Sequence, residues 1–294
     1  MEEENEKLLA GCVVLYNPDR YIIKNIESYL FFLNVLYVVD NSENVDRDLI
    51  DNLCSLSSKI VYIPQSNNTG IASALNLSAK LALSEKYSWL LTMDQDSYFN
   101  GPIFFYKWAG IISNDKIGLV ATSYTAEYDR WQKGYSMDFN EIHFTVTSGN
   151  IINLKAWKEV EGFEVKLFID EVDHDYCLKL RKKGYKILIS KEILMGHQIG
   201  EFYPGDLNDE AGNRKRTLHR PVRYYYMSRN VLYLCKKYFF TDFRFVLARF
   251  YYLMKGLTKI ILLYPNKLTY LRFFFEGIKD FALSKYDKYD KYDK

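Results

Sequence analysis

The stretch that most narrows the possible folds of this chain is residues 89–97, WLLTMDQDS. It begins with an apolar run, residues 89–93, whose length is typical of a strand that is buried on both faces of a parallel sheet. The run ends in two carboxylates one residue apart, Asp94 and Asp96. Ligands of open α/β sheets bind outside the carboxyl ends of the strands, so the acidic pair falls where a ligand is expected.

Two explanations fit Asp94 and Asp96. Neighbouring carboxylates repel each other unless a cation or a hydrogen-bonded ligand lies between them. Hard oxygen ligands at a strand end suit Mg²⁺ or Mn²⁺, which also bind phosphate oxygens. Alternatively, Asp-Gln-Asp-Ser forms a solvated turn, which uses the same residue types. The motif alone does not decide between a metal site and a turn, because acidic turns are common.

Predicted strands and helices alternate at short intervals around this stretch, as read from apolar runs and from apolar residues at helical spacing. Up to residue 93 the predicted order is strand 9–15, helix 22–33, strand 35–39, helix 49–56, strand 59–63, helix 71–83 and strand 89–93. This alternation is typical of βαβ units in a mostly parallel sheet, whose right-handed crossovers align the strand ends at one edge. Further along we expect a helix at 101–112 and strands at 118–121, 142–147 and 185–189.

The aligned edge collects polar side chains from the connections after four strands: Tyr16, Asn17, Asp40, Asn41, Asn67, Asn68, Asp94 and Asp96. No G-x-G-x-x-G or G-K-[ST] motif is present, so a dinucleotide or P-loop site loses its main support. An acidic edge binds a diphosphate only with a divalent cation between the charges. Asp40 either accepts hydrogen bonds from a base or ribose, or closes its strand with an Asx turn.

A second acidic cluster opens a predicted helix and places four carboxylates within six positions: Asp170, Glu171, Asp173 and Asp175. Acidic residues in a first turn are favoured by the helix dipole, which explains some of them. Four exceed what capping requires, so at least one is expected to face a ligand. A carboxylate beside a substrate hydroxyl is the usual general base.

Three smaller features lie between and after the acidic clusters. The small, polar segment Ser148-Gly149-Asn150 allows close approach of its backbone to a ligand. Trp157 is expected in the core more than at a ligand platform, and a lone His197 is more often structural than a ligand.

Charge is divided unequally along the chain. Of the net +2, residues 214–283 account for +12 and residues 284–294 for +1, which leaves −11 for residues 1–213. The basic region is aromatic and helical in pattern, which fits helices lying on an anionic membrane surface or a helical subdomain with a solvated basic face. No RNA-binding motif supports a nucleic-acid partner. The Lys-Tyr-Asp repeat of residues 284–294 is predicted to be disordered.

The remaining composition indicates a reducing compartment. The four cysteines are scattered, without a C-x-x-C pair, which argues for free thiols in a cytosol. The start, MEEENEK, is acidic and unlike a signal peptide, and no run of about 18 apolar residues lacks charges, so no spanning helix is expected. We therefore expect a cytoplasmic protein, peripheral on the cytoplasmic face of the membrane.

An ordered series of motifs runs through the chain: VVLYNP (13–18), VVDNS (38–42), NNTGIASALN (67–76), LLTMDQDS (90–97), TSGNIIN (147–153), FIDEVDHDYCLKLRKKGY (168–185), GHQIG (196–200) and RYYYMSRN (223–230). The series, which covers roughly residues 8–235, resembles the inverting family 2 glycosyltransferases and their bacterial rhamnosyltransferase-like branch. The resemblance implies an α/β GT-A fold, Rossmann-like, with a mostly parallel central sheet and a C-terminal helical extension. It places the catalytic domain at 1–213, the basic aromatic helices at 214–283 and the tail at 284–294.

The resemblance also implies roles for individual residues. Asp96 matches the metal ligand, Asp94 lies nearer the ribose or metal, and His197 completes the metal site. The residues expected to contact the nucleotide-sugar are Tyr16, Asn17, Asp40 (at the base), Asn41, Asn68, Gly70, Asp94 and Gln95. Asp173 matches the base that deprotonates the acceptor, although Val172 stands where relatives have Glu, so Asp170 stays an alternative. The expected acceptor or sugar pocket holds Ser148, Gly149, Asn150, Trp157, Asp170 and Glu171.

Together these matches imply a hexosyltransferase that needs Mn²⁺ or Mg²⁺ and inverts the anomeric carbon in one displacement. The donor would be a UDP- or dTDP-sugar, with dTDP-rhamnose as the specific candidate. The acceptor would be a hydroxyl of a growing polysaccharide or lipid-linked glycan at the inner leaflet. Transfer of galactose, glucose or an N-acetylhexosamine is an alternative, and so is a catalytically silent nucleotide-sugar-binding scaffold.

Overall fold

The computed structural model describes residues 8–123, 132–197, 219–264 and 266–289. The chain divides into two compact units. We call Met1–Phe168 with Val172–Gln198 the sheet unit, and Ile169–Glu171 with Ile199–Lys294 the helical unit. The boundary expected at residues 213 and 214 lies outside the described residues.

Within the described residues, the sheet unit contains a nine-stranded sheet in the order β3-β2-β1-β4-β9-β6-β10-β8-β7. The first four strands of that order are parallel, as the βαβ pattern predicts, and β10 is parallel to β6. The pairings through β9, β8 and β7 are antiparallel, so the sheet is mixed beyond β4. The strands are β1 (Leu9–Leu15), β2 (Val35–Asp40), β3 (Ile60–Pro64), β4 (Trp89–Asp94), β6 (Ile117–Ser123), β7 (Gln132–Gly134), β8 (Phe139–Ile142), β9 (Asn150–Asn153) and β10 (Lys186–Ile193).

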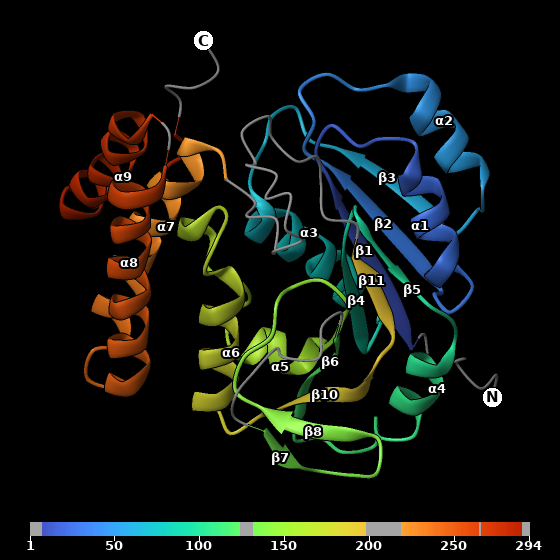
Figure 1. Ribbon diagram of the computed structural model, residues 1–294. Coiled ribbons are helices and arrows are strands. Elements are labelled where there is room, and N and C mark those ends of the chain that lie inside the picture. The colour runs from blue at the N-terminus through green and yellow to red at the C-terminus, as the bar shows by residue number, and fades with distance from the viewer. Residues whose placement is uncertain (1–7, 124–131, 198–218, 265, 290–294) are drawn as a thin grey trace, which may run out of the picture. The chain divides into compact units, whose positions relative to one another are not determined.

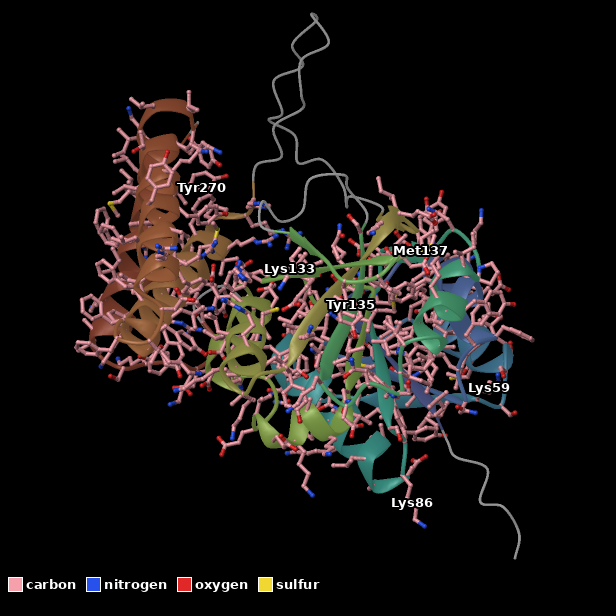
Figure 2. All side chains as sticks on the ribbon, turned by 90° about the horizontal axis from the view of Figure 1, so that it is seen from below. Lys59, Lys86, Lys133, Tyr135, Met137 and Tyr270 are labelled. Atoms are coloured by element: carbon pink, nitrogen blue, oxygen red, sulfur yellow. The ribbon has the colours of Figure 1, made fainter. Side chains whose placement is uncertain are left out.

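Helices cover both faces of this sheet (Figure 1). Helices α1 and α2 lie on one face and α3 on the other, as expected when right-handed crossovers first run outward from β1 and then return to β4. Their buried side chains belong to the core, whereas Lys86, two residues after the end of α3, points away from the sheet (Figure 2). The helices are α1 (Tyr21–Leu30), α2 (Arg47–Ser55), α3 (Ile71–Ser84), α4 (Ile103–Ala109), α5 (Leu154–Glu159), the 3₁₀ turn η1 (Val165–Leu167) and α6 (Val172–Lys182).

The strand predicted at residues 142–147 is wrong. Strand β8 ends at Ile142, and the chain then forms a loop as far as Gly149. Side chains of neighbouring elements bind the loop's carbonyl groups in place of a strand ladder. The Thr92 hydroxyl of β4 donates to the carbonyl of Thr147 at 2.6 Å, and the Cys177 thiol of α6 lies 3.9 Å from that of Thr145. The alternation of apolar and polar residues in the sequence predicts a strand, but it does not show that these carbonyl groups bind side chains instead of a neighbouring strand.

A short two-stranded sheet lies beside the end of β4. Strand β5 (Ser97–Phe99) pairs antiparallel with β11 (Met195–His197), which places His197 opposite Ser97. Sequence periodicity did not predict this pairing, because both strands have only three residues. It joins two distant motifs.

The helical unit contains α7 (Pro221–Tyr238), α8 (Phe243–Leu263) and α9 (Lys267–Ala282). Gly277 of α9 allows the backbone of α7 to come close, since a Cβ there would lie 2.3 Å from the carbonyl oxygen of Tyr225. The rings of Tyr224, Tyr264 and Tyr270 pack edge to face and join the three helices; Tyr270 is labelled in Figure 2. No helix within the described residues is both long and apolar enough to cross a membrane.

The described part of the C-terminal tail packs against these helices, whereas the sequence predicts a disordered tail. The ring of Tyr286 contacts Tyr233, and the ring of Tyr289 packs against Tyr225 at a tilt of 44°, with 4.3 Å between centroids. Tyr289 is buried, and its amide donates to the Tyr226 hydroxyl at 3.0 Å. The three-residue repeat brings successive tyrosines to a surface of other tyrosines, which a composition-based prediction does not register. Residues 290–294 lie outside the described residues.

Candidate active site

The carboxyl ends of three parallel strands bring the predicted polar residues to one edge of the sheet. Strand β1 lies between β2 and β4, and in this register Leu15 is opposite Asp40 and Val14 is opposite Asp94. The connection after β1 therefore begins beside the last residues of both neighbours. The parallel register of the strands, and no local feature of the motifs, places this connection there.

Hydrogen bonds tie the β1 connection to both neighbouring strands. The Tyr16 amide donates to Oε1 of Gln95 at 2.8 Å, and Nε2 of Gln95 donates to the Tyr16 carbonyl at 3.3 Å. The Asn17 amide, at a left-handed φ of 47°, donates to the Ser42 hydroxyl at 2.7 Å. Nδ2 of Asn25 donates to the Gln95 carbonyl at 2.9 Å. Both ends of the Tyr16-Asn17 turn are thus held in place.

Asp40 closes its own turn. Its Oδ1 accepts from the Ser42 amide at 2.9 Å, which is the Asx geometry, and its Oδ2 accepts from the Tyr62 hydroxyl at 2.7 Å. Burial and this carboxylate together raise the pKa of the Tyr62 hydroxyl. Asp40 itself is only 1% exposed. Each carboxylate oxygen has a second lone pair, so the turn leaves acceptor capacity for a ligand.

The connection before α3 is held by Asn41 and shaped by a glycine. Oδ1 of Asn41 accepts from the Thr69 hydroxyl at 3.1 Å, and Oδ1 of Asn68 accepts from the Gly70 amide at 3.0 Å. Gly70 has φ +81° at the N-cap of α3, and a Cβ there would lie 2.6 Å from the Phe168 ring. The Ile71 amide donates to the Phe168 carbonyl at 2.9 Å. Only glycine fits this position, and through it the loop meets the chain just before α6.

The Asp94 and Asp96 pair lies at the end of β4, with both residues half-buried. The Asp94 amide donates to the Ser148 hydroxyl at 3.0 Å, and that hydroxyl donates to Ser97 Oγ at 2.9 Å. The β5–β11 pairing sets the backbone of His197 opposite Ser97, next to Asp96 in the chain. The side chain of His197 lies outside the described residues. Among the described side chains, no group of three His, Cys, Asp or Glu residues is assembled that could hold a metal ion.

This donor set fits a divalent cation in its chemistry. Two carboxylates from one strand end suit Mg²⁺ or Mn²⁺, which keep several waters and take phosphate oxygens as further ligands. The backbone of His197 pairs with that of Ser97 in the strand that follows this acidic pair.

Ser148, Gly149 and Asn150 form a buried turn beside the acidic pair. The Gly149 amide donates to the Thr92 carbonyl at 2.9 Å, and a Cβ at its φ of +75° would lie 2.5 Å from the sulfur of Met195. The Asn150 side chain donates to the carbonyl of Val146. The turn is therefore positioned by β4 and β11, and glycine is required at its centre.

The four carboxylates of the second acidic cluster have different environments. Asp175 is fully buried and lies 3.5 Å from Lys179, one turn along α6. Asp170 and Glu171 belong to the helical unit, where each pairs with an arginine, Arg223 and Arg249 respectively. These three carboxylates thus contact cations of the protein itself.

Asp173 lies in the first turn of α6, within the sheet unit. Its Oδ1 accepts from the His174 amide at 2.8 Å and lies 3.2 Å from the His174 ring nitrogen Nδ1. Asp173 lines a cavity of about 10 Å³, room for about one water, together with Thr145, Asn150 and Tyr176. It is 21% exposed. Asp173 therefore combines solvent access with a place beside the Ser148-Gly149-Asn150 turn, through Asn150.

Trp157, predicted as part of the sugar pocket, is a core residue instead. It is 6% exposed, and its Nε1 donates to Oδ1 of Asn76 on α3 at 3.2 Å. A Cβ at Gly162 would lie 2.8 Å from the same nitrogen. The indole joins α5 to α3, which agrees with the core alternative drawn from the sequence.

The sequence did not single out several residues that build this edge: Asn25, Ser42, Tyr62, Thr69 and Ser97. Asn25 had a usable signal, because it lies on the apolar face of α1 between Ile22 and Ile26 and is only 3% exposed. A polar residue at such a position needs a partner. Tyr62 had none, because an aromatic residue in a strand is ordinary.

The fold is the GT-A fold of solved glycosyltransferases. PcManGT, a mannosyltransferase from Pyrobaculum calidifontis solved with GDP-Man and Mn²⁺, matches with a TM-score of 0.58 at 11% identity, over 96% of this chain and 87% of that one. GalNAc-T7, solved with UDP, GalNAc and Mn²⁺, matches with a TM-score of 0.57 at 12% identity over 66% of this chain. This chain spans 44% of the GalNAc-T7 chain, less than half of its length. At these identities the likeness is one of fold.

The sequence comparisons give the family. The model for glycosyl transferase family 2 matches residues 12–175, more than half of the chain. The chain belongs to glycosyl transferase family 2. It is also 27% identical over 252 residues to the dTDP-rhamnosyl transferase RfbF of Shigella flexneri, covering 78% of this chain and 80% of that protein.

Proposed function

We propose that this glycosyltransferase moves rhamnose from dTDP-rhamnose to a hydroxyl of a growing polysaccharide or lipid-linked glycan, with inversion at the anomeric carbon. The observation that carries the proposal is the meeting of Asp40, Asn41 and Asp94 at one sheet edge in parallel register. The printed name of the RfbF relative supports the donor. A UDP-linked galactose, glucose or N-acetylhexosamine would use the same edge.

In this proposal the edge binds the donor through its base, ribose and diphosphate. Asp40 and Asn41 receive the base, while Tyr16, Asn17, Asn68 and Gln95 surround the nucleoside. Asp94, Asp96 and His197 would hold a divalent metal, which neutralises the leaving diphosphate when bound. The Mn²⁺ in both structural neighbours supports a metal here.

Asp173 is the proposed general base. It accepts the proton of the acceptor hydroxyl as that oxygen attacks the anomeric carbon from the face opposite the diphosphate. Asp170, the alternative base, forms hydrogen bonds with Arg223 at 2.9 to 3.3 Å, so its carboxylate oxygens already bind a cation of the protein. The single displacement inverts the carbon and needs no protein nucleophile. Ser148, Gly149 and Asn150 would border the sugar.

Calorimetric titration tests the donor site. The protein is titrated with dTDP-rhamnose, UDP-glucose, UDP-galactose and UDP-GlcNAc, each with and without Mn²⁺, alongside Asp96→Ala. Metal-dependent binding of dTDP-rhamnose that disappears in Asp96→Ala is the expected result. Binding of one of the UDP-sugars in place of dTDP-rhamnose would assign that sugar as the donor. If no donor binds with either Mn²⁺ or Mg²⁺, a catalytically silent scaffold becomes the better explanation.

We also propose that α8 attaches the protein to the anionic inner leaflet, where a lipid-linked acceptor would lie. Phe243, Leu247, Phe250 and Ile261 are exposed and, at their helical spacing, form one stripe along α8. The exposed Arg244, Lys255 and Lys259 follow the neighbouring stripe, and α8 contains no acidic residue. An exposed apolar stripe with a basic border fits a helix lying in a membrane interface.

Vesicle flotation tests the attachment. The full chain should float with vesicles containing phosphatidylserine and much less with phosphatidylcholine alone, and high salt should weaken its binding. Equal flotation with both vesicle types, unaffected by salt, would contradict the basic border. Failure to float with either would leave α8 as the face of a soluble helical subdomain.

A further inference from the structure

Three of the four residues between η1 and α6 have an unusual backbone. Phe168, Asp170 and Glu171 all have positive φ, at 59°, 61° and 67°. Residues other than glycine rarely adopt this conformation, and they keep it where surrounding contacts hold them. Ile169–Glu171 belongs to the helical unit, although the chain on both sides belongs to the sheet unit. Two residues after Glu171 comes Asp173.

An arginine of α7 binds the first carboxylate of this segment at two nitrogens. Arg223 donates from Nη2 to Oδ1 of Asp170 at 2.9 Å, and from Nε to Oδ1 and Oδ2 at 3.2 and 3.3 Å. The carboxylate in turn raises the pKa of the Arg223 guanidinium. A guanidinium that donates from two nitrogens in this way, like a fork, fixes the orientation of the carboxylate as well as pairing with its charge.

An asparagine of α7 binds the main chain of the same segment. Nδ2 of Asn230 donates to the carbonyls of Ile169 at 2.7 Å and Asp170 at 3.1 Å. Oδ1 of Asn230 accepts from Nε of the fully buried Arg229 at 3.0 Å, which fixes which end of the amide faces the segment. Asn230 is itself fully buried.

An arginine of α8 binds the last residue of the segment. Arg249 donates to Oε1 of Glu171, which is 6% exposed. The side chain of Arg249 is 15% exposed, so this ion pair is shielded from water. Each of the three residues 169–171 therefore has its own partner on α7 or α8.

We propose that Arg223, Asn230 and Arg249 are positioning residues for glycosyl transfer, and we call them the anchor residues. By holding Ile169–Glu171 they set where α6 begins, and so where Asp173 is presented. Successive residues of a helix are turned by about 100°, so a start shifted by one residue would direct the carboxylate elsewhere. The inference rests on the proposed role of Asp173.

Steady-state kinetics of Arg223→Ala, Asn230→Ala and Arg249→Ala test this proposal. We expect kcat to fall about tenfold to a hundredfold, because small displacements of a catalytic group have effects of this size. KM for the donor should stay within about twofold, because the anchor residues bind residues 169–171 and not the proposed nucleotide edge at Asp40 and Asn41. Arg223→Lys, which keeps the charge but not the fork, should recover part of kcat. Arg272→Ala is the matched control: Arg272 lies in the same unit and pairs with Glu276 on the surface.

The results that would overturn the proposal are also specific. Wild-type kcat in all three alanine variants would contradict it, as would equal losses of kcat and donor affinity. If Arg249→Ala fails to fold, Asn230→Ala and Arg223→Lys carry the test, with thermal unfolding as the check on folding. Asp173→Asn in the same assay separates the two claims. If Asp173→Asn loses transfer while the anchor variants keep it, only the positioning role of the anchor residues is rejected. If Asp173→Asn keeps full activity, the proposed base and the positioning role are both rejected.

Discussion

In the sheet unit, helix α1 turns Ile22 and Ile26 inward and buries them, whereas in the helical unit α8 exposes Leu247, Phe250 and Leu262. Leu262 is 73% exposed, and Ile26 is fully buried. Burial of a leucine or isoleucine side chain contributes about 1.5–3 kcal/mol, and an exposed one forgoes it. The difference teaches that α1 uses its apolar residues for stability, whereas α8 leaves many of its own exposed, on the surface that we propose binds a membrane.

The largest expected effect is on the stability of the sheet unit. Leu91→Ala removes a fully buried side chain from β4, and the cavity it leaves should lower the free energy of unfolding by about 2–5 kcal/mol. Urea denaturation of the purified protein measures the change. A loss below about 1 kcal/mol would show that β4 is less central to the core than its position between β1 and β9 implies.

The second-largest expected effect distinguishes glycosyl transfer from membrane binding. Asp173→Asn should lower kcat about a hundredfold or more, because removal of a general base has an effect of this order. Donor binding and vesicle flotation should not change. The exposed Asp115→Asn serves as the control carboxylate. Transfer at the wild-type rate would reassign the base.

A smaller effect tests the helical unit. Phe250→Glu with Leu262→Glu should weaken binding to anionic vesicles at least about tenfold, because both apolar contact area and charge complementarity are lost. Transfer to a water-soluble acceptor should persist. Phe31→Glu offers a control, since Phe31 is an exposed aromatic residue of the sheet unit. An equal loss of vesicle binding in the double variant and in Phe31→Glu would mean that exposed apolar area in general, and not α8 in particular, governs binding.

The smallest effect sharpens the contrast in stability. Leu262→Ala should change the free energy of unfolding by less than about 0.5 kcal/mol, as substitutions at exposed positions usually do. Urea denaturation beside Leu91→Ala gives the direct comparison of a buried and an exposed leucine. A loss above about 2 kcal/mol would show that Leu262 is covered in solution, since only removal of buried side chains has such effects.

Much of the sheet unit was predictable because its signals are local. The apolar runs of β1, β2 and β4 lie within one residue of their predicted ends. The carboxyl-edge placement of Asp40 and Asp94 followed from right-handed crossovers alone. The prediction was wrong at residues 142–147, where the chain is a loop, and it gave residues 284–294 as a disordered tail, of which Tyr289 packs on α7. In both places the partners of the segment are distant in sequence.

By itself, the sequence determined the alternation of strands and helices, the acidic strand end and the family motifs, because each depends on residues close together in the chain. Only the tertiary structure decided which carboxylates of residues 170–175 pair with arginine or lysine and which one lines a cavity. It also brought His197 beside Ser97 and Trp157 into the core. The physical reason is that burial, and each of these ion pairs except Asp175–Lys179, depend on partners tens of residues away, which only the folded chain brings together.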